Sequence, residues 1–264
     1  MMRAMEPLID AAWLRAHRDE VHVVDCQYVL GDPGGGRRRY LEGHLPGATF
    51  LSVEEDLSGS AGGGRNPLPT PDELVTAARR AGIRDDVAVV AYDRAMEGGA
   101  ARLWWLLRHI GKDDVAVLDG GLQAWPGPLA TGEETAPPGD LQARPGRDDL
   151  LTAEQVAARL DEPGRVLVDT RAPERFRGER EPVDPVAGHI PGARNLPNDR
   201  ELPEALAAAD DEIVAYCGSG VSACVLLVRL AAAGRDDAKL YAGSWSEWSA
   251  LGYPVATGEE PTGD

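Results

Sequence analysis

The chain of 264 residues carries 27 Lys and Arg against 44 Asp and Glu, a formal net charge of −17, and this acidity excludes a broad surface for nucleic acid or for an anionic membrane. Its three cysteines are too few for a disulfide framework and lack the spacing of metal ligands, and no apolar run is long enough to cross a membrane. The first residues lack the apolar stretch of a secretory signal, so we expect a cytoplasmic protein.

Four sequence landmarks occur twice, in the same order along the chain. The pairs are VVDC (23–26) with LVDT (167–170), GHLPGA (43–48) with GHIPGA (188–193), VVAYD (89–93) with IVAYC (213–217), and LDGGLQAW (118–125) with YAGSWSEW (241–248). The first copy also carries a longer, Gly-rich segment at 57–71. The repeat predicts two domains of one fold, at 6–130 and 151–258, joined by a linker at 131–150 that is rich in Pro, Gly and charge.

Within each copy, short apolar runs alternate with helical patterns. A helix is expected after the capping Thr70, and another after Thr152, which forms a capping-box pattern with Gln155. The stretch 221–234 is apolar on nearly all sides and predicts a buried helix. Apolar strands that alternate with helices indicate an α/β fold, with a short parallel sheet flanked by helices in each domain.

The segment IVAYCGSGVSACVLLVRL (213–230) is the strongest candidate for a functional site. A buried strand is followed by a glycine-bearing loop and by a helix expected to start near Val221. Sites of open α/β sheets gather at the carboxyl ends of strands, beside helix N-termini. Backbone N–H groups and the helix dipole favour a thiolate at Cys217 there, while Gly218 and Gly220 let the loop curl around the sulfur. A buried structural cysteine is the alternative interpretation.

Three mechanisms could use such a loop. GSGVSA (218–223) matches the dinucleotide pattern G-x-G-x-x-A, but only 23 residues follow Tyr241, too few for the further strands of such a fold. A cysteine-dependent phosphatase needs an arginine six residues after its nucleophile, where Ala223 stands. Sulfur transfer through a persulfide needs a cysteine in a cradle of N–H groups and no such arginine, so it fits these residues best.

The tandem arrangement, the GHLPGA and GHIPGA turns and the CGSGVSA loop resemble the two-domain rhodanese-like sulfurtransferases over nearly the whole chain. The loop is the most specific element. The 3-mercaptopyruvate branch has C-G-[ST]-G-V-T, whereas thiosulfate-preferring enzymes have C-R-K-G-V-T. Residues 217–221 match the former, and Ser222 keeps the hydroxyl of its threonine. The resemblance implies a catalytic second domain and an inactive first domain, with Asp93 in the place of Cys217.

An uncharged loop also suits a 2-oxo thiol acid better than dianionic thiosulfate, because a more distant arginine can hold the single carboxylate. The resemblance implies that Arg175, in RFRG, holds that carboxylate. A second family arginine aligns near Val183 and Asp184, and Arg180 is the candidate to replace it. The sequence therefore predicts the substrate-binding side chains on the segment DTRAPERFRGEREP (169–182).

Two turn histidines, His44 and His189, lie in the two GH-x-PGA turns. We expect His189 to bond to the backbone. The resemblance implies a Ser/His/Asp relay in which Ser219 and His44 take part, with Asp32 as the candidate acid. Both Ser219 and His44 are therefore candidate catalytic residues.

The remaining candidates are expected to be structural. Arg171 and Arg177 are expected to make ion pairs at the surface or between the domains. Trp245 and Trp248 are expected either to wall the site or to pack in the core, and Cys224 is expected to be a packed thiol.

We therefore expect a sulfurtransferase that moves sulfane sulfur from 3-mercaptopyruvate, through a Cys217 persulfide, to cyanide or to a thiol acceptor such as a small redox protein. Gly218, Gly220, Val221 and Ser222 are expected to line the substrate. The alternatives are a thiosulfate sulfurtransferase, which would release sulfite, and a non-catalytic carrier of sulfane sulfur. No cofactor, metal, nucleic acid or membrane partner is implied.

Overall fold

The computed structural model describes residues 5–160 and 162–259. These residues form two compact units. The first unit holds the chain up to Ser60 together with Leu68–Arg147, and the second holds Ala61–Pro67 together with the chain from Asp148 onward. The short segment 61–67 thus groups with the second unit, although it falls inside the range expected for the first domain.

Part of the segment expected as a linker is anchored to the first unit. The chain passes to the second unit only after Arg147. Before that point, the Gly139 N–H donates to the Arg79 carbonyl at 2.8 Å, and the Arg79 Nε donates to the Leu141 carbonyl at 2.8 Å. The Leu141 side chain is fully buried. Residues 131–147 therefore group with the first unit, where the buried Leu141 side chain and the bonds to Arg79 hold part of the segment.

The first unit is a parallel five-stranded sheet in the order β1-β5-β4-β2-β3. Its strands are β1 (Leu8–Ile9), β2 (Val21–Asp25), β3 (Thr49–Phe50), β4 (Ala88–Tyr92) and β5 (Val115–Leu118). Its helices are α1 (Ala11–Ala16), α2 (Gly35–Glu42), α3 (Pro71–Arg80) and α4 (Gly99–His109), with a 3₁₀ turn η1 (Gly121–Ala124).

The second unit repeats this architecture, with the parallel order β6-β10-β9-β7-β8. Its strands are β6 (Leu150–Leu151), β7 (Arg165–Asp169), β8 (Arg194–Asn195), β9 (Glu212–Tyr216) and β10 (Lys239–Tyr241). Its helices are α5 (Ala153–Ala157), α6 (Pro173–Phe176), α7 (Glu204–Ala208), α8 (Ala223–Ala232) and α9 (Ser244–Ala250). The predicted α/β class and the parallel sheets are confirmed.

Corresponding residues of the two sheets are paired in the same register. Asp25 lies opposite Tyr92 in the first sheet, and Asp169 lies opposite Tyr216 in the second. The repeated turn histidines are also paired alike, because short antiparallel bridges join His44 to Ala130 and His189 to Ala256. The two units therefore repeat the pairing of their strands and turns as well as the sequence landmarks.

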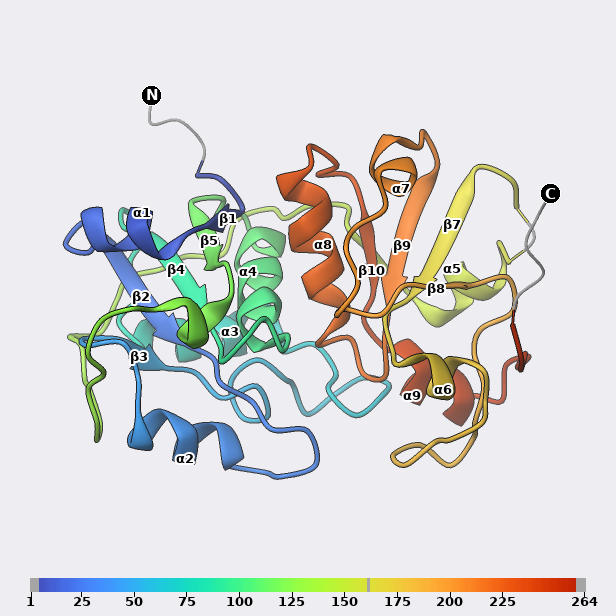
Figure 1. Cartoon of the computed structure of the whole chain (residues 1–264), viewed down its shortest axis with the longest axis horizontal. Coiled ribbons are helices and arrows are strands. Elements are labelled where there is room, and N and C mark those ends of the chain that lie inside the picture. Colours follow the sequence, from blue (N-terminus) through green and yellow to red (C-terminus); the bar gives the residue numbers. More distant parts are fainter. Residues whose placement is uncertain (1–4, 161, 260–264) are drawn as a thin grey trace. The chain divides into compact units, whose positions relative to one another are not determined.

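Helices cover the sheets where the apolar patterns predict them. α4 packs on β4 and β5, and α8 packs on β9 and β10 (Figure 1). The predicted capping box of Thr152 with Gln155 is present, and Thr70, predicted as a cap, also forms a capping box, with Glu73. α8 begins at Ala223, two residues later than expected. The reason is that the preceding residues form a tighter turn of i to i+3 bonds, such as that from the Cys224 N–H to the Val221 carbonyl.

No helix in the described ranges combines the length and apolar character that crossing a bilayer requires.

Candidate active site

The Cys217 sulfur lies where β9 ends and the chain turns toward α8. The residue is 2% exposed. The Gly220 N–H donates to Sγ at 3.1 Å, and the Cys217 N–H donates to the Ser244 Oγ at 3.1 Å. An N–H that points at the sulfur stabilises negative charge there. The tight loop that the sequence predicts after this strand is therefore present, with the sulfur inside the curl of the chain.

Gly220 makes that curl possible. Its φ is +75°, in the left-handed region, and a Cβ atom at this position would lie 2.2 Å from the Ala242 carbonyl oxygen. Any other residue would have to move the backbone of either segment. The requirement for glycine here follows from both the backbone conformation and the close approach of the chain after β10.

The start of α9 fixes the other side of the loop. The Trp245 N–H donates to the Cys217 carbonyl at 3.0 Å, and the Ser246 N–H donates to the Gly218 carbonyl at 3.0 Å. Trp245 and Trp248 are fully buried in the core of the unit. Of the two interpretations left open for these tryptophans, core packing is the one that the structure supports.

Two guanidinium groups lie over Gly218, the residue that follows the cysteine. A Cβ atom on Gly218 would lie 2.8 Å from the Arg65 Nη2 and 3.5 Å from both Nη atoms of Arg175. Arg175, for which the resemblance implies a substrate-binding role, is on α6. Arg65 comes from the segment 61–67 and was not singled out by the sequence analysis. Glycine at 218 thus leaves room for positive charge beside the residue that follows the cysteine.

Buried carboxylates hold these arginines in place. Arg175 donates to Glu181 through Nε (3.0 Å) and Nη2 (2.7 Å), and to Asp184 at 3.2 Å. Asp184 also forms an ion pair with Arg65. Burial raises the pKa of Glu181, but the hydrogen bonds from Arg175 and from backbone N–H groups outweigh it, so the pKa lies below its usual value. Glu181 is therefore a charged anchor for Arg175.

The expectation of a surface or interdomain ion pair is wrong for Arg171. Its side chain is 1% exposed, bonds to Asp169 at 2.6 Å and to the Gly188 carbonyl at 2.7 Å, and lies 4.7 Å from the Trp245 ring centroid. Burial lowers the pKa of this guanidinium, but the adjacent Asp169 charge opposes that effect, and the pKa lies above its usual value. Arg177 behaves as expected and pairs with Glu179 at 2.8 Å at the surface of the second unit.

The other predicted loop residues are mostly enclosed. Ser219 and Val221 are buried, and Ser222 is half-buried, with its carbonyl accepting from the Asn198 Nδ2 at 2.8 Å. Arg180 is exposed, and its backbone N–H bonds to the Glu174 carbonyl at 3.1 Å. The second guanidinium that the structure brings to Gly218 is thus that of Arg65 rather than that of Arg180.

The remaining cysteines are buried thiols. The Cys224 Sγ donates to the Gly220 carbonyl at 3.4 Å, in agreement with the expected packed thiol. Cys26 follows β2 in the first unit, and burial raises the pKa of its thiol well above the usual range. None of the three cysteines, all of which lie in the described ranges, forms a disulfide.

In the first unit, Asp93 takes the position that Cys217 has in the second. Its carboxylate accepts four backbone N–H bonds. They come to Oδ1 from Ala95 (3.2 Å) and Glu97 (3.0 Å), and to Oδ2 from Gly98 (2.9 Å) and Ala100 (3.3 Å). The corresponding loop of the first unit therefore binds an anion that belongs to the protein itself, the Asp93 carboxylate.

His44 is fully buried within the first unit. Its Nδ1 bonds to the Tyr40 carbonyl at 2.8 Å, its ring stacks on that of Tyr40, and its Nε2 lies 4.0 Å from the Glu134 carboxylate. Asp32, the candidate acid of a relay, instead pairs with Arg38 at the surface. His189 matches His44 closely, since its Nδ1 bonds to the Phe176 carbonyl at 2.7 Å and its ring stacks on Phe176. A catalytic role of His44 stays a prediction.

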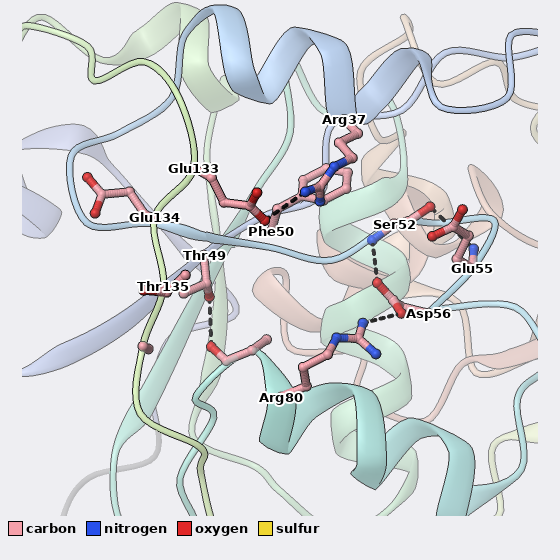
Figure 2. A pocket seen from close by; sticks show the side chains of 12 residues that line it. Arg37, Thr49, Phe50, Ser52, Glu55, Asp56, Arg80, Glu133, Glu134 and Thr135 are labelled. Atoms are coloured by element: carbon pink, nitrogen blue, oxygen red, sulfur yellow. Dashed lines mark hydrogen bonds and ion pairs between the residues drawn. The ribbon is translucent and has the colours of Figure 1, made fainter.

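The first unit has a polar cavity of about 610 Å³. Figure 2 shows that its charged side chains point toward one another, Arg37 toward Glu133 at 2.6 Å and Arg80 toward Asp56. Its wall is formed by Arg37, Thr49, Phe50, Ser52, Glu55, Asp56, Arg80, Ala81, Glu133, Glu134, Thr135 and Ala136. None of these twelve side chains is a cysteine, so the cavity offers no thiol that could carry sulfur.

Within the described ranges, no three or more His, Cys, Asp or Glu side chains are grouped so that they could hold a metal ion.

Comparison with known proteins places this chain in a family. The rhodanese-like domain model matches residues 10–127 and 152–251. The probable 3-mercaptopyruvate sulfurtransferase of Pseudomonas aeruginosa is 46% identical, over 93% of this chain and 95% of its own. A putative thiosulfate sulfurtransferase of Mycobacterium tuberculosis is 44% identical, over 88% of each chain. The crystal structure of the 3-mercaptopyruvate sulfotransferase SseA from Escherichia coli superposes with a TM-score of 0.79 at 30% identity, covering 92% of this chain and all of the other.

The chain therefore belongs to the rhodanese-like family, as a two-domain sulfurtransferase.

Proposed function

We propose that this sulfurtransferase takes the thiol sulfur of 3-mercaptopyruvate and carries it as the sulfane sulfur of a persulfide on Cys217. The observation that carries the proposal is the juxtaposition of the Cys217 sulfur, the Gly220 N–H bond to it and the arginine groups over Gly218. The names of the relatives from P. aeruginosa and E. coli support the same donor.

In the proposed first step, the Cys217 thiolate attacks the sulfur of 3-mercaptopyruvate. An S–S bond forms, the C3–S bond breaks, and its electron pair leaves on the enolate of pyruvate. The enolate takes up a proton at C3, which balances the proton that the substrate thiol brings. The cysteine is left as a persulfide, and the Gly220 N–H stabilises the negative charge that the sulfur carries.

In the proposed second step, a thiol acceptor, such as that of a small redox protein, or cyanide attacks the outer sulfur and regenerates the Cys217 thiolate. No organic cofactor or metal is needed for either step. The hydroxyl groups of Ser219 and Ser222 and the backbone of Val221 are proposed to line the bound sulfur, and His44 to assist proton transfer. We also propose that the reaction takes place in the cytoplasm.

The charge around the loop supports a monoanionic substrate. The loop residues 218–222 carry no charged side chain, and the two arginines over Gly218 are balanced by the carboxylates of Glu181 and Asp184. A single carboxylate can therefore bind without the strong positive potential that a dianion favours.

Thiosulfate as donor is the second candidate, and the name of the M. tuberculosis relative favours it. It would give the same Cys217 persulfide and release sulfite. A sulfane-sulfur carrier without turnover would need the same loop.

The test is a rate assay on the purified full chain with cyanide as acceptor. Pyruvate is followed with 3-mercaptopyruvate and sulfite with thiosulfate. The Cys217→Ser variant is the blank, and Cys26→Ala, which removes a buried thiol of the first unit, is the matched control that should keep turnover. Preference for 3-mercaptopyruvate supports the proposal. Preference for thiosulfate overturns the donor, and turnover by Cys217→Ser overturns the mechanism.

A third outcome separates the carrier from the enzyme. If neither donor supports turnover but the mass of the full chain rises by one sulfur atom, and only when Cys217 is present, the protein is a carrier and the proposed catalytic cycle is wrong.

A further inference from the structure

The segment 61–67 lies between β3 and α3 of the first unit in chain order, yet it packs on the second unit. The Arg65 N–H donates to the Ser246 Oγ at 3.1 Å. A Cβ atom on Gly63 would lie 1.8 Å from the Glu247 Oε1, and one on Gly64 would lie 2.7 Å from the Gly243 carbonyl oxygen. The glycine run 62–64 is therefore what allows the segment to lie flat against the start of α9.

This packing delivers the Arg65 side chain to the loop that follows Cys217. Its Nη1 forms an ion pair with Asp184, which is 4% exposed, and its Nη2 is the group that lies 2.8 Å from the Cβ position of Gly218. The Arg65 side chain itself is 28% exposed, so a ligand can reach it. The guanidinium of Arg65 is thus held by Asp184 through Nη1, while its Nη2 points toward Gly218.

Arg175 is presented in the same way. The Nε and Nη2 of Arg175 donate to Glu181, while the Nη1 of Arg175 lies 3.5 Å from the same Cβ position on Gly218. The two arginines share Asp184, which bonds to Arg65 through one oxygen and to Arg175 through the other. Two N–H groups from different segments therefore converge beside the residue that follows the nucleophile. A planar carboxylate, with two oxygens, matches such a pair.

We propose that Arg65 is a substrate-binding residue, which holds the carboxylate of a 2-oxo thiol acid together with Arg175. This inference rests on the proposed function and adds to it a residue from outside the catalytic repeat. The Asp184 carboxylate keeps the two guanidinium groups apart and fixed, so the substrate carboxylate meets a prepared site. The carbon chain of the substrate then extends from Gly218 toward the sulfur of Cys217.

The first test compares Arg65→Gln and Arg65→Lys with the unchanged protein, with kcat/KM measured for pyruvate release from 3-mercaptopyruvate. We expect Arg65→Gln to lower kcat/KM by about 10-fold or more, because a charge-assisted hydrogen bond to the substrate is lost. Arg65→Lys should recover part of that loss. Arg177→Ala is the matched control, since Arg177 is 29% exposed and paired with acids in the same unit, and it should change kcat/KM by less than about 2-fold.

The methyl ester of 3-mercaptopyruvate tests the chemistry of the contact. The ester has no carboxylate charge, so Arg65→Gln should leave its turnover within about 2-fold of that of the unchanged protein. An equal loss with acid and ester would show that the variant disturbs the sulfur site, and it would overturn the assignment.

A double variant separates direct contact from positioning. If Arg65 binds the carboxylate itself, Arg65→Gln should lower kcat/KM further, by about 3-fold or more, in an Arg175→Ala background. No further loss would mean that Arg65 acts only by positioning Arg175 through Asp184, and the assignment would be wrong. Gly64→Ala should mimic Arg65→Gln, because it prevents the segment from docking.

Failure of this inference is distinguishable from failure of the proposed function. If the unchanged protein releases no pyruvate, the proposed donor is wrong. If it releases pyruvate and Arg65→Gln, with an unchanged thermal unfolding midpoint, releases it equally well, only the assignment of Arg65 is wrong.

Discussion

Asp93 and Cys217 occupy the same position in the two units, directly after the middle strand of each sheet. Around Asp93, four backbone N–H groups converge on a carboxylate that belongs to the protein. At Cys217, the Gly220 N–H points at a sulfur. The first unit is therefore a version of the same loop in which a permanent anion takes the place that a reactive sulfur has in the second.

Replacement of Asp93 by Ala should destabilise the protein. The change leaves four backbone N–H groups without their acceptor, two of them in buried bonds, and we expect a loss of about 3 kcal/mol or more in the free energy of unfolding. Urea unfolding of the full chain measures it. Asp86→Ala is the matched control, because Asp86 is an exposed acid of the same unit and should cost less than about 1 kcal/mol. Equal effects of the two substitutions would contradict the role of the cradle.

Gly220→Ala should abolish most of the activity. Its Cβ would collide with the Ala242 carbonyl oxygen, so the N–H would leave the Cys217 sulfur. We expect turnover to fall by about 100-fold or more, as for the loss of an oxyanion-type donor. Gly234→Ala is the control for backbone strain alone, because Gly234 has φ +90° and open space where a Cβ would be. Gly234→Ala should keep turnover and lose only stability, and a similar drop in both activities would refute this account.

The stability of the first unit should depend on the ionisation of Asp25. Burial raises the pKa of this carboxyl to about 6 from 3.8, against partial opposition from hydrogen bonds with Tyr92 and Gln27. The folded state then binds more protons than the unfolded state between about pH 4 and pH 6, so this group's contribution to stability falls as the pH rises through that window. The full difference is about 3 kcal/mol.

Asp25→Asn removes this ionisation. The stability of the variant relative to the unchanged protein should therefore rise between pH 4 and pH 7.5 by about 3 kcal/mol, measured as the free energy of unfolding in urea at several pH values. Asp169→Asn is the comparison, because Asp169 bonds to the buried Arg171 and its replacement leaves that charge without its main partner. A pH-independent difference for Asp25→Asn would show that the carboxyl group does not titrate in this window.

Arg171→Ala should be among the most destabilising single changes in the second unit. Removal of the guanidinium leaves Asp169 and Glu181 buried with one cation fewer, at a cost of about 3–5 kcal/mol. Arg177→Ala, at the surface, should cost less than about 1 kcal/mol. Thermal or urea unfolding of the two variants, measured side by side, tests the contrast, and similar costs would mean that Arg171 is not the buried ion-pair partner described above.

The sequence predicts the features that local pattern controls. Short apolar runs separated by capped helices specify the two parallel sheets, and the glycines around Cys217 specify a tight loop at a strand end. The resemblance to the family singles out Arg175 through the local motif RFRG, and its substrate-binding role stays a prediction. In each case the information lies within about ten residues along the chain, where strand, turn and helix preferences act.

Sequence reasoning missed the features that depend on distant segments. Arg65 lies in a Gly-rich stretch that reads as an ordinary surface loop, and its docking depends on Glu247 and Gly243, far away in sequence. The unusually long insertion at 57–71 was the one available signal. Arg171 was expected at the surface because it lies in a charged segment, and only the fold brings Asp169, Glu181 and the Trp245 ring around it.

The docking of residues 61–67 also has a consequence for the gene. A first half that lacks the nucleophile could be lost from the gene if it served only as a spacer. Here it encodes Arg65, which forms an ion pair with Asp184 of the second half. A clone that begins at Asp148 would express the whole of the second repeat and still lack this cation. The two halves must therefore be kept together in evolution and in engineering, because residues 61–67 of the first repeat belong to the second structural unit.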